Sequence, residues 1–363
     1  MPGFLQPDRT STYHPALAWF AAASAAWVFV LVMLGAFTTS IGAGMAFPDW
    51  PLSNGSLNPT GWLQDLALFA EHSHRLSAAI MSTITVLLAA GLWRSEARRW
   101  LRRLGGFAVA LVLVQAVIGG LRVLLDQYQV AAVDTSVGRL FAMLHACLAQ
   151  VFICTLLAIA AALSRPWVER APPRRRTVGP AWAGAGTCRL GIVCCGLLLG
   201  QLAIAAVMRH SFAGLAIPTF PLTPAGGLLP AHWDFRVGVN FAHRAMALVL
   251  AAALLWFALA VWSERAAGVG LRALTVLMVA LLATQVLLGA MVIWTGRNAY
   301  FTTAHVLVGA LTLATTFLLT WTMHRDELEG TVRDGAPRGR ALPAADQSSI
   351  DADGGAIGSS LHA

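Results

Sequence analysis

Residues 69–93 read FAEHSHRLSAAIMSTITVLLAAGLW, with an acid, two histidines and an arginine near the start and no charge after Arg75. An apolar segment of about 20 residues is long enough to cross a bilayer as a helix. Titratable groups inside such a helix are costly and usually functional. The stretch therefore predicts a membrane-spanning helix that carries a functional site near its first turns.

The composition of the whole chain supports a membrane protein. Of its 363 residues, 57% are hydrophobic and 12% are charged, and the mean hydropathy is +0.67. A soluble domain carries about 25% charged residues, so this chain has too few to coat a water-exposed surface. These values exclude a soluble enzyme, a disordered protein and a nucleic-acid-binding domain.

Eight apolar stretches are long enough to span a bilayer, so we expect an all-α polytopic protein. The first stretch is too long for a signal peptide, and no basic, Ser-rich pre-sequence precedes it, so we expect it to be retained. The predicted spans are residues 17–38, 69–93, 104–125, 139–163, 188–208, 239–262, 272–295 and 301–323.

The basic residues indicate the orientation of these spans. All 25 basic residues are arginines, and with 17 acids they give a net charge of +8. Arginines concentrate in the connections at 94–103, 165–189 and 265–272, whereas connection 39–68 has none. The positive-inside rule then places both termini and the arginine-rich connections in the cytoplasm, and we expect a multi-pass protein of the bacterial inner membrane. The charge is thus a sign of topology, and no nucleic-acid partner is expected.

The second half of the chain repeats the first. Phe47-Pro-Asp-Trp-Pro-Leu corresponds to Ile217-Pro-Thr-Phe-Pro-Leu, 170 positions later, and further matches follow in the same order. Each repeat has four spans, so we predict two tandem four-helix bundles related by a pseudo-two-fold axis along the membrane normal. The further matches are His74-Arg75 with His243-Arg244, Gln115 with Gln285, Gly119 with Gly289, and His145 with His305.

This repeat predicts five regions. They are a cytoplasmic N-terminus (1–16), an N-terminal bundle (17–163), an Arg- and Pro-rich cytoplasmic linker (164–187), a C-terminal bundle (188–323) and a cytoplasmic tail (324–363). The tail has seven acids, four arginines and no aromatic residue, a composition typical of disorder.

Four histidines lie within the predicted spans, each within about seven residues of the outer end of its helix: His74, His145, His243 and His305. At 1.5 Å per residue they share a depth of roughly 5–10 Å below the outer edge. Each bundle then offers two imidazoles across its core. Two imidazoles do not complete a zinc site, but they are the axial ligands that haem iron uses. The alternative is four core histidines that bond to the backbone or to each other.

Other charged groups accompany the histidines. Arg75 and Arg244 follow two of them and are candidate partners of haem propionates, unless they extend to the interface. Glu71 lies three residues before His74, whereas Asn240 takes that place before His243. We therefore expect the chemistry in the first bundle and an electron-transferring haem in the second. The alternative is a simple Glu71–Arg75 ion pair at i,i+4.

The PDWPL loop, Glu71-x-x-His74-Arg75, His145, His243-Arg244 and His305 together resemble the haem A synthase family, over residues 17–323. The resemblance implies that one methyl group of haem O is oxidised to the formyl group of haem A for terminal oxidases. It implies a haem b cofactor on His243 and His305, haem O on His74 and His145, and Glu71 as the essential acid. It leaves contact with a haem O synthase or with oxidase assembly factors open, and also a homo-oligomer.

One feature departs from that family. Many members carry a cysteine pair flanking the PDWPL loop, but Phe47 and Ser53 stand at those places. The chain thus resembles the cysteine-free subgroup, and a thiol role in electron delivery is in doubt. Two other functions fit four paired histidines: a di-haem b protein that oxidises quinol and transfers electrons, and a haem transporter or chaperone. The common depth of the histidines argues against electron transfer across the membrane.

Overall fold

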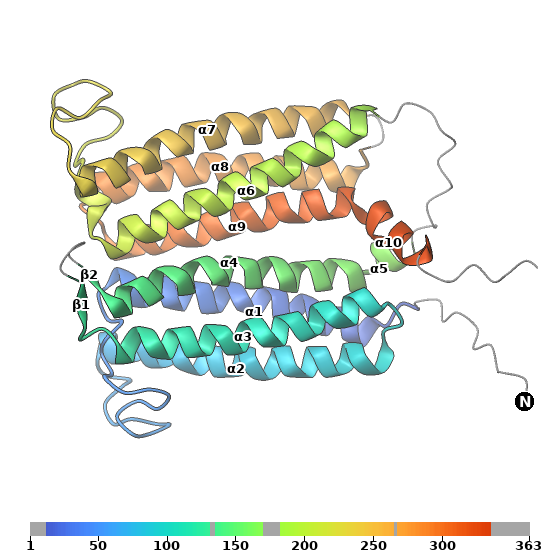
Figure 1. Ribbon diagram of the computed structural model, residues 1–363, viewed down its shortest axis with the longest axis horizontal. Helices are drawn as coiled ribbons and strands as arrows, with labels where there is room; N and C mark the ends of the chain where they lie inside the picture. Colours follow the sequence, from blue (N-terminus) through green and yellow to red (C-terminus); the bar gives the residue numbers. More distant parts are fainter. Residues whose placement is uncertain (1–11, 131–134, 170–181, 265–266, 335–363) are drawn as a thin grey trace, which may run out of the picture.

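A computed structural model describes residues 12–130, 135–169, 182–264 and 267–334. Its eight long helices are apolar enough to cross a membrane, which confirms the predicted all-α polytopic fold. They form two groups of four that lie side by side (Figure 1). The first group comprises α1 (Pro15–Ser40), α2 (Leu66–Ser95), α3 (Arg99–Leu124) and α4 (Val137–Leu163), and the second α6 (Trp182–His210), α7 (Phe235–Ser263), α8 (Val269–Trp294) and α9 (Ala299–Met323).

The two groups meet along a seam made by four of these helices. In the first group α1 packs against α2 and α4, and in the second α9 packs against α8 and α6. Across the seam, α1 contacts α9, and α4 contacts both α6 and α9. The core of the first group contains the buried side chains of Leu88, Ile153 and Leu156, together with Ala310 of α9. The predicted two-fold relation between the groups stays a prediction.

The four helices that carry the predicted histidines all begin at a polar capping residue. The caps of α2 and α7 are Asp65 and Asp234, whose carboxylates accept hydrogen bonds from backbone N–H groups of the first turn. Ser136 caps α4 and Asn298 caps α9 in the same way. Such caps satisfy N–H groups that have no partner within the helix. They make the helices begin two to four residues before the predicted starts, which hydropathy alone does not reveal.

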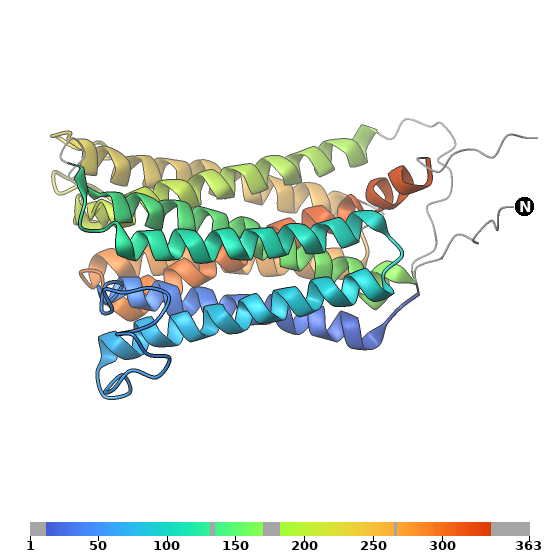
Figure 2. The ribbon, with the colours of Figure 1, turned by 60° about the horizontal axis from the view of Figure 1, so that its bottom comes forward.

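The connections are divided between the two ends of the molecule. Figures 1 and 2 show the long loops after α1 and α6 at one end, and α5 (Arg165–Val168) and α10 (Arg325–Asp334) at the other. The loop end also holds the short hairpin of β1 (Gln129–Val130) and β2 (Thr135–Ser136) and the turn η2 (Ala213–Leu215). The described parts of the arginine-rich connections, residues 94–103, 165–169, 182–189 and 267–272, therefore share the end opposite the loops.

The segment after α9 begins as the helix α10, whereas disorder was predicted for residues 324–363. Glu329 of α10 binds the Arg98 guanidinium at 3.0 Å and accepts a hydrogen bond from the Trp167 indole at 2.8 Å. Arg325 donates to the carbonyl oxygen of Trp167. These contacts order the first ten residues against the first group. The rest of the predicted tail, residues 335–363, lies outside the described residues, as do 1–11 of the predicted N-terminus and 170–181 of the linker.

The same end contains a buried ion pair between Glu96 and Arg98, 2.8 Å apart, with side chains 3% and 8% exposed. Burial raises the pKa of Glu96, but hydrogen bonds and charge from Arg98 outweigh it and leave that pKa below its ordinary value of 4.5. A lowered pKa in the folded state stabilises the fold above the ordinary pKa. This stabilisation is lost as the pH falls through the lowered value.

We expect Glu96→Gln to destabilise the protein by about 1–3 kcal/mol at pH 7, because it removes the more buried of the two carboxylates paired with Arg98 and leaves only Glu329 as a counter-charge. Thermal unfolding in detergent measures the effect. The matched control is Glu169→Gln, which breaks an exposed pair with Arg165 and should change stability by less than about 1 kcal/mol. The difference in stability between the Glu96→Gln variant and the unmodified protein should become smaller below pH 4.5. Equal effects of the two substitutions would contradict this assignment.

Candidate functional site

His243 of α7 and His305 of α9 face each other inside the second group. Their ring centroids lie 6.5 Å apart and their planes make an angle of 64°. With metal–imidazole bonds of about 2 Å, two axial imidazoles on one iron have centroids roughly 6 Å apart. The spacing of this pair therefore suits ligation of a single iron from both sides. The Nδ1 atom of His305 is buried without a hydrogen bond among the described residues.

His74 of α2 and His145 of α4 form the matching pair in the first group. Their imidazoles interact electrostatically, and the buried Nδ1 atom of each has no hydrogen bond among the described residues. His74 lies eight residues after the start of α2, as His145 does in α4 and His243 in α7, and His305 lies six residues after the start of α9. All four histidines thus occupy similar levels, about 9–12 Å along their helices.

Glycines on neighbouring helices make room for three of these imidazoles. A Cβ atom added at Gly35 of α1 would lie 2.7 Å from Cε1 of His74, and one at Gly289 of α8 would lie 3.1 Å from Cε1 of His305. At Gly119 of α3 the corresponding distance to His145 is 3.4 Å. Any larger residue at Gly35 would therefore displace the imidazole.

Glutamine side chains lie beside three of the four histidines. Gln201 of α6 donates to the carbonyl oxygen of His243 at 3.0 Å, and its amide nitrogen lies 3.2 Å from Nδ1 of the ring. Gln115 of α3 donates to the carbonyl oxygen of His145. The amide nitrogen of Gln285 lies 3.4 Å from Nε2 of His305. These contacts position the histidine backbone and rings within each group.

Glu71 is 4% exposed and pairs with Arg75, the alternative that the i,i+4 spacing allowed. Its Oε1 lies 2.6 Å from Nη2 of Arg75, and its Oε2 accepts a hydrogen bond from the backbone N–H of Phe47 at 3.0 Å. Arg75 also donates to the carbonyl oxygens of Phe47, Asp49 and Leu52. The pair therefore ties the outer loop to α2, one turn from His74.

The second group makes a related contact with its outer loop, but the helix side chain donates the hydrogen bonds instead of accepting one. Asn240, at the place of Glu71, donates to the carbonyl oxygens of Ala213 and Gly214 at 2.9 and 3.1 Å. Arg244 donates to the carbonyl oxygen of Ile217 at 2.7 Å, as Arg75 does to that of Phe47. Both arginines thus hold an outer loop, and only the first group has a carboxylate there. Their predicted contact with haem propionates stays a prediction.

The loop with the PDWPL stretch folds back over the first group. The Asp49 carboxylate accepts hydrogen bonds from the backbone N–H groups of Asn54 and Gly55 at 2.8 and 2.7 Å. Burial raises the pKa of Asp49, but these hydrogen bonds and the charge of Arg75 together outweigh it and lower the pKa below its usual value. The Trp50 ring packs against Gly120 of α3. Asp49 therefore stabilises a turn, while Trp50 fixes the loop to the helices.

His72 is a buried residue of this region that has no histidine at the matching place in the second half of the sequence. It is 3% exposed, and its Nδ1 lies 3.0 Å from Oγ of Ser53. Its ring packs between Phe47 and Trp62. Contacts of Phe47 and Ser53 with His72 therefore hold this part of the loop. The lack of a repeat counterpart concealed this role in the sequence.

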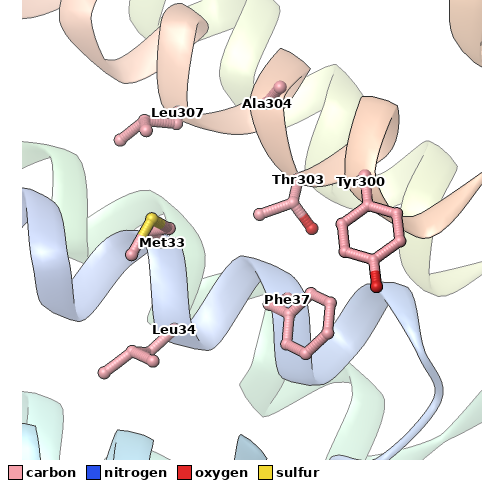
Figure 3. Close-up of a pocket in the computed structure, with 7 residues that line it drawn as sticks. All are labelled: Met33, Leu34, Phe37, Tyr300, Thr303, Ala304 and Leu307. Carbon is pink, nitrogen blue, oxygen red and sulfur yellow. The ribbon is translucent and has the colours of Figure 1, made fainter.

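An apolar cavity of about 310 Å³ lies apart from the histidine pairs, between α1 and α9 (Figure 3). Phe37 and Tyr300 approach each other at its edge, with ring centroids 6.0 Å apart. Its lining contains no acid, histidine or arginine, so it offers no metal ligand. The lining residues are Met33, Leu34, Phe37, Tyr300, Thr303, Ala304 and Leu307.

Within the described residues, no cluster of three or more His, Cys, Asp or Glu side chains has the geometry of a metal site. Each group instead offers two imidazoles. A site of this kind suits a metal whose remaining ligands come from a macrocycle, as in haem, rather than a free ion.

The chain resembles several characterised proteins. It is 27% identical to the haem A synthase of Geobacillus kaustophilus over 305 residues, which cover 80% of this chain and 86% of that protein. It is 28% identical to the haem A synthase of Listeria monocytogenes over 287 residues, covering 77% and 86%. A shorter match, 40% over 100 residues, covers 27% of this chain and 21% of the protohaem IX farnesyltransferase of Halobacterium salinarum.

The family model named COX15-CtaA, cytochrome oxidase assembly protein, matches residues 63–317. The match includes both histidine pairs, Glu71, six of the eight long helices in full and most of α9. Since it extends over most of the sequence, this chain belongs to the COX15-CtaA family of cytochrome oxidase assembly proteins.

Proposed function

We propose that this membrane protein is a haem A synthase, which oxidises one methyl group of haem O to the formyl group of haem A. The observation that carries the proposal is the facing pair His243 and His305, together with the buried, interacting imidazoles of His74 and His145 and a buried carboxylate beside these two alone. The relatives named haem A synthase, aligned over most of the chain, support the same reaction.

His243 and His305 would hold haem b, and His74 and His145 would hold the haem O substrate. The fit rests on the 6.5 Å spacing of His243 and His305, on the buried Nδ1 atoms of His74, His145 and His305 that have no hydrogen bond among the described residues, and on the glycine beside each of three rings. The first group is then the substrate domain and the second the cofactor domain. The resident haem would supply electron transfer to and from the substrate site.

The residues of the first group hold a substrate and exclude water. Arg75 and Glu71 hold the outer loop over the end of the bundle, and the Trp50 ring closes its side against α3. The two oxygens of Glu71 are engaged by Arg75 and by the N–H of Phe47, so the carboxylate is fixed in direction. A fixed negative charge stabilises positive charge that develops at a reacting methyl carbon. Proton transfer by Glu71 would require one of these contacts to open.

The other assignments follow from this function. The end with the long loops would face the outside of a bacterial inner membrane, and both termini would lie in the cytoplasm, because arginines gather at the opposite end. A haem O synthase would supply the substrate, and oxidase assembly factors would receive the product. The di-haem electron-transfer alternative is less well supported, since histidines at one level do not place two haems across the membrane.

The test is to express the chain in cells that make haem O but lack haem A synthesis, and to extract the pigments. The proposal predicts that haem A appears while haem O is consumed. A transporter or an electron-transfer protein would leave haem O unconverted, which would refute the proposed reaction.

We expect Gly35→Ala to weaken binding of haem O at the first pair, because the new Cβ collides with the His74 ring. An absorbance titration of haem O into protein that already contains its resident haem measures this affinity. Gly106→Ala on α3 is the matched control, because a Cβ there meets no atom within 4 Å. We expect at least a tenfold loss for Gly35→Ala and none for the control. Unchanged binding by both variants would contradict the assigned position of the substrate.

A further inference from the structure

Arg122 lies in the last turn of α3, at the level of the outer loops, and the repeat analysis gave it no role. Its positive charge acts on both His74 and His145. Its guanidinium rests directly on the backbone of Gly44, where an added Cβ would collide with Nη2. Only a glycine permits this approach, so the loop after α1 holds the guanidinium at the outer end of the first group, within electrostatic range of both histidines.

The charge of Arg122 is not neutralised inside the described parts of the chain, where its side chain forms no hydrogen bond or ion pair. The two carboxylates that attract it are Glu71 and Asp126. Glu71 already binds Arg75, and Asp126 accepts a hydrogen bond from the hydroxyl of Ser136. A guanidinium near the membrane without a counter-ion is costly, so its position favours an anionic ligand.

Further cations surround it at the seam. Arg209 of α6 donates to the Ala36 carbonyl oxygen at 2.7 Å, and its charge acts on Arg122. Arg139 lies over the Phe212 ring at 4.9 Å, and Arg297 lies beside Gly214. Among the residues that the structure describes, none of these arginines forms an ion pair with a carboxylate. The outer end of the seam therefore has a positive potential that attracts carboxylates or phosphates.

Arg75, the arginine that the sequence favoured as an anion ligand, is less available. It has five N–H groups, and it makes four hydrogen bonds to Glu71 and to loop carbonyl oxygens. A ligand carboxylate would have to displace those contacts. The N–H groups of Arg122 have no such hydrogen bonds to break among the described residues.

We propose that Arg122 binds a propionate carboxylate of the porphyrin held between His74 and His145, and so positions the substrate. This inference rests on the proposed function. Propionates are the anionic groups at one edge of a haem, and a planar guanidinium binds a carboxylate through two parallel hydrogen bonds. Fixing that edge fixes the rotation of the ring between the two imidazoles. Arg122 therefore determines which methyl group is presented to Glu71.

The experiment uses the full chain, purified with its resident haem, and titrates it with haem O or with haem O dimethyl ester. We expect the unmodified protein to bind the free acid about 10–100-fold more tightly than the ester, the range for a hydrogen bond to a charged group. Arg122→Gln should abolish this preference, and Arg122→Lys should keep part of it. Arg165→Gln, in the exposed pair with Glu169 at the opposite end of the molecule, is the control and should keep it fully. The spectrum of the resident haem verifies that each variant is folded.

Each other outcome overturns the proposal in a recognisable way. If Arg122→Gln keeps the full preference for the free acid, the propionate lies elsewhere. If that variant loses bound phospholipid or inorganic phosphate while its preference is unchanged, Arg122 binds a phosphate. If the unmodified protein binds neither form of haem O, the proposed function itself fails, and not only the role of Arg122.

Discussion

Replacing His305 by alanine is expected to remove the low-spin spectrum of a haem with two axial imidazoles from the purified protein. His243→Ala should have the same effect, because the two rings face each other at 6.5 Å and each supplies one of two ligands. Loss of one axial ligand changes the coordination and spin state of the iron. Absorption spectra of the oxidised and reduced protein measure the result, together with the haem content per chain.

The matched control for this prediction is His324→Ala. His324 follows the last residue of α9, and its Nδ1 lies 2.8 Å from the carbonyl oxygen of Thr320, far along the same helix from His305. The control should retain both haem content and spectrum. A normal low-spin spectrum in His243→Ala and His305→Ala alike would place the resident haem at other residues.

Replacing Glu71 by alanine is expected to stop the formation of haem A while the resident haem remains bound. Glu71 is buried one turn before His74, and the second group has Asn240 in its place. The carboxylate is therefore found beside the proposed substrate site and not beside the proposed haem b site. Removal of a group that moves a proton or stabilises charge costs about 100-fold or more in rate. Extraction of haems after a timed incubation with haem O measures the product.

Two further variants separate the charge of Glu71 from its support of the loop. Glu71→Gln keeps an oxygen that accepts the N–H of Phe47 but removes the charge, so it should be as inactive as Glu71→Ala. Phe47→Leu keeps Glu71 and its backbone contact and should retain most activity. If Glu71→Gln forms haem A at the normal rate, the carboxylate has no part in the reaction.

Hydropathy was sufficient to predict the number and order of the membrane helices, and the motifs around the four histidines were sufficient to indicate their family. The predicted helix starts and the repeat of the second half of the chain also indicated that four histidines lie at one level, because both features can be read from the sequence. The helix starts were less accurate, since Asp65 and Asp234 are polar residues that begin apolar helices. A hydropathy profile starts a helix at its first apolar residues and so leaves the capping residue out, although aspartate is favoured at the N-cap.

The parts that the sequence did not predict depend on how the loops and chain ends fold back. His72 is polar and unmatched in the repeat, but the loop residues Phe47 and Ser53 bury it. Arg122 has no counterpart at the repeat offset, and only the approach of Gly44 reveals its direction. The helix α10 has a polar composition typical of disorder, yet its contact with Arg98 orders it. Contacts between segments that are distant in the sequence determine the burial of His72, the position of Arg122 and the folding of α10.

The central claim is that each group of four helices holds one iron porphyrin between its two histidines. Pyridine haemochrome analysis of the purified full chain, supplied with haem O during expression, tests this most directly. The account predicts up to two haems per chain, one of them haem b and the other haem O or haem A. Protein that is folded and contains no iron porphyrin, or that keeps its full haem content when all four histidines are replaced, would contradict it.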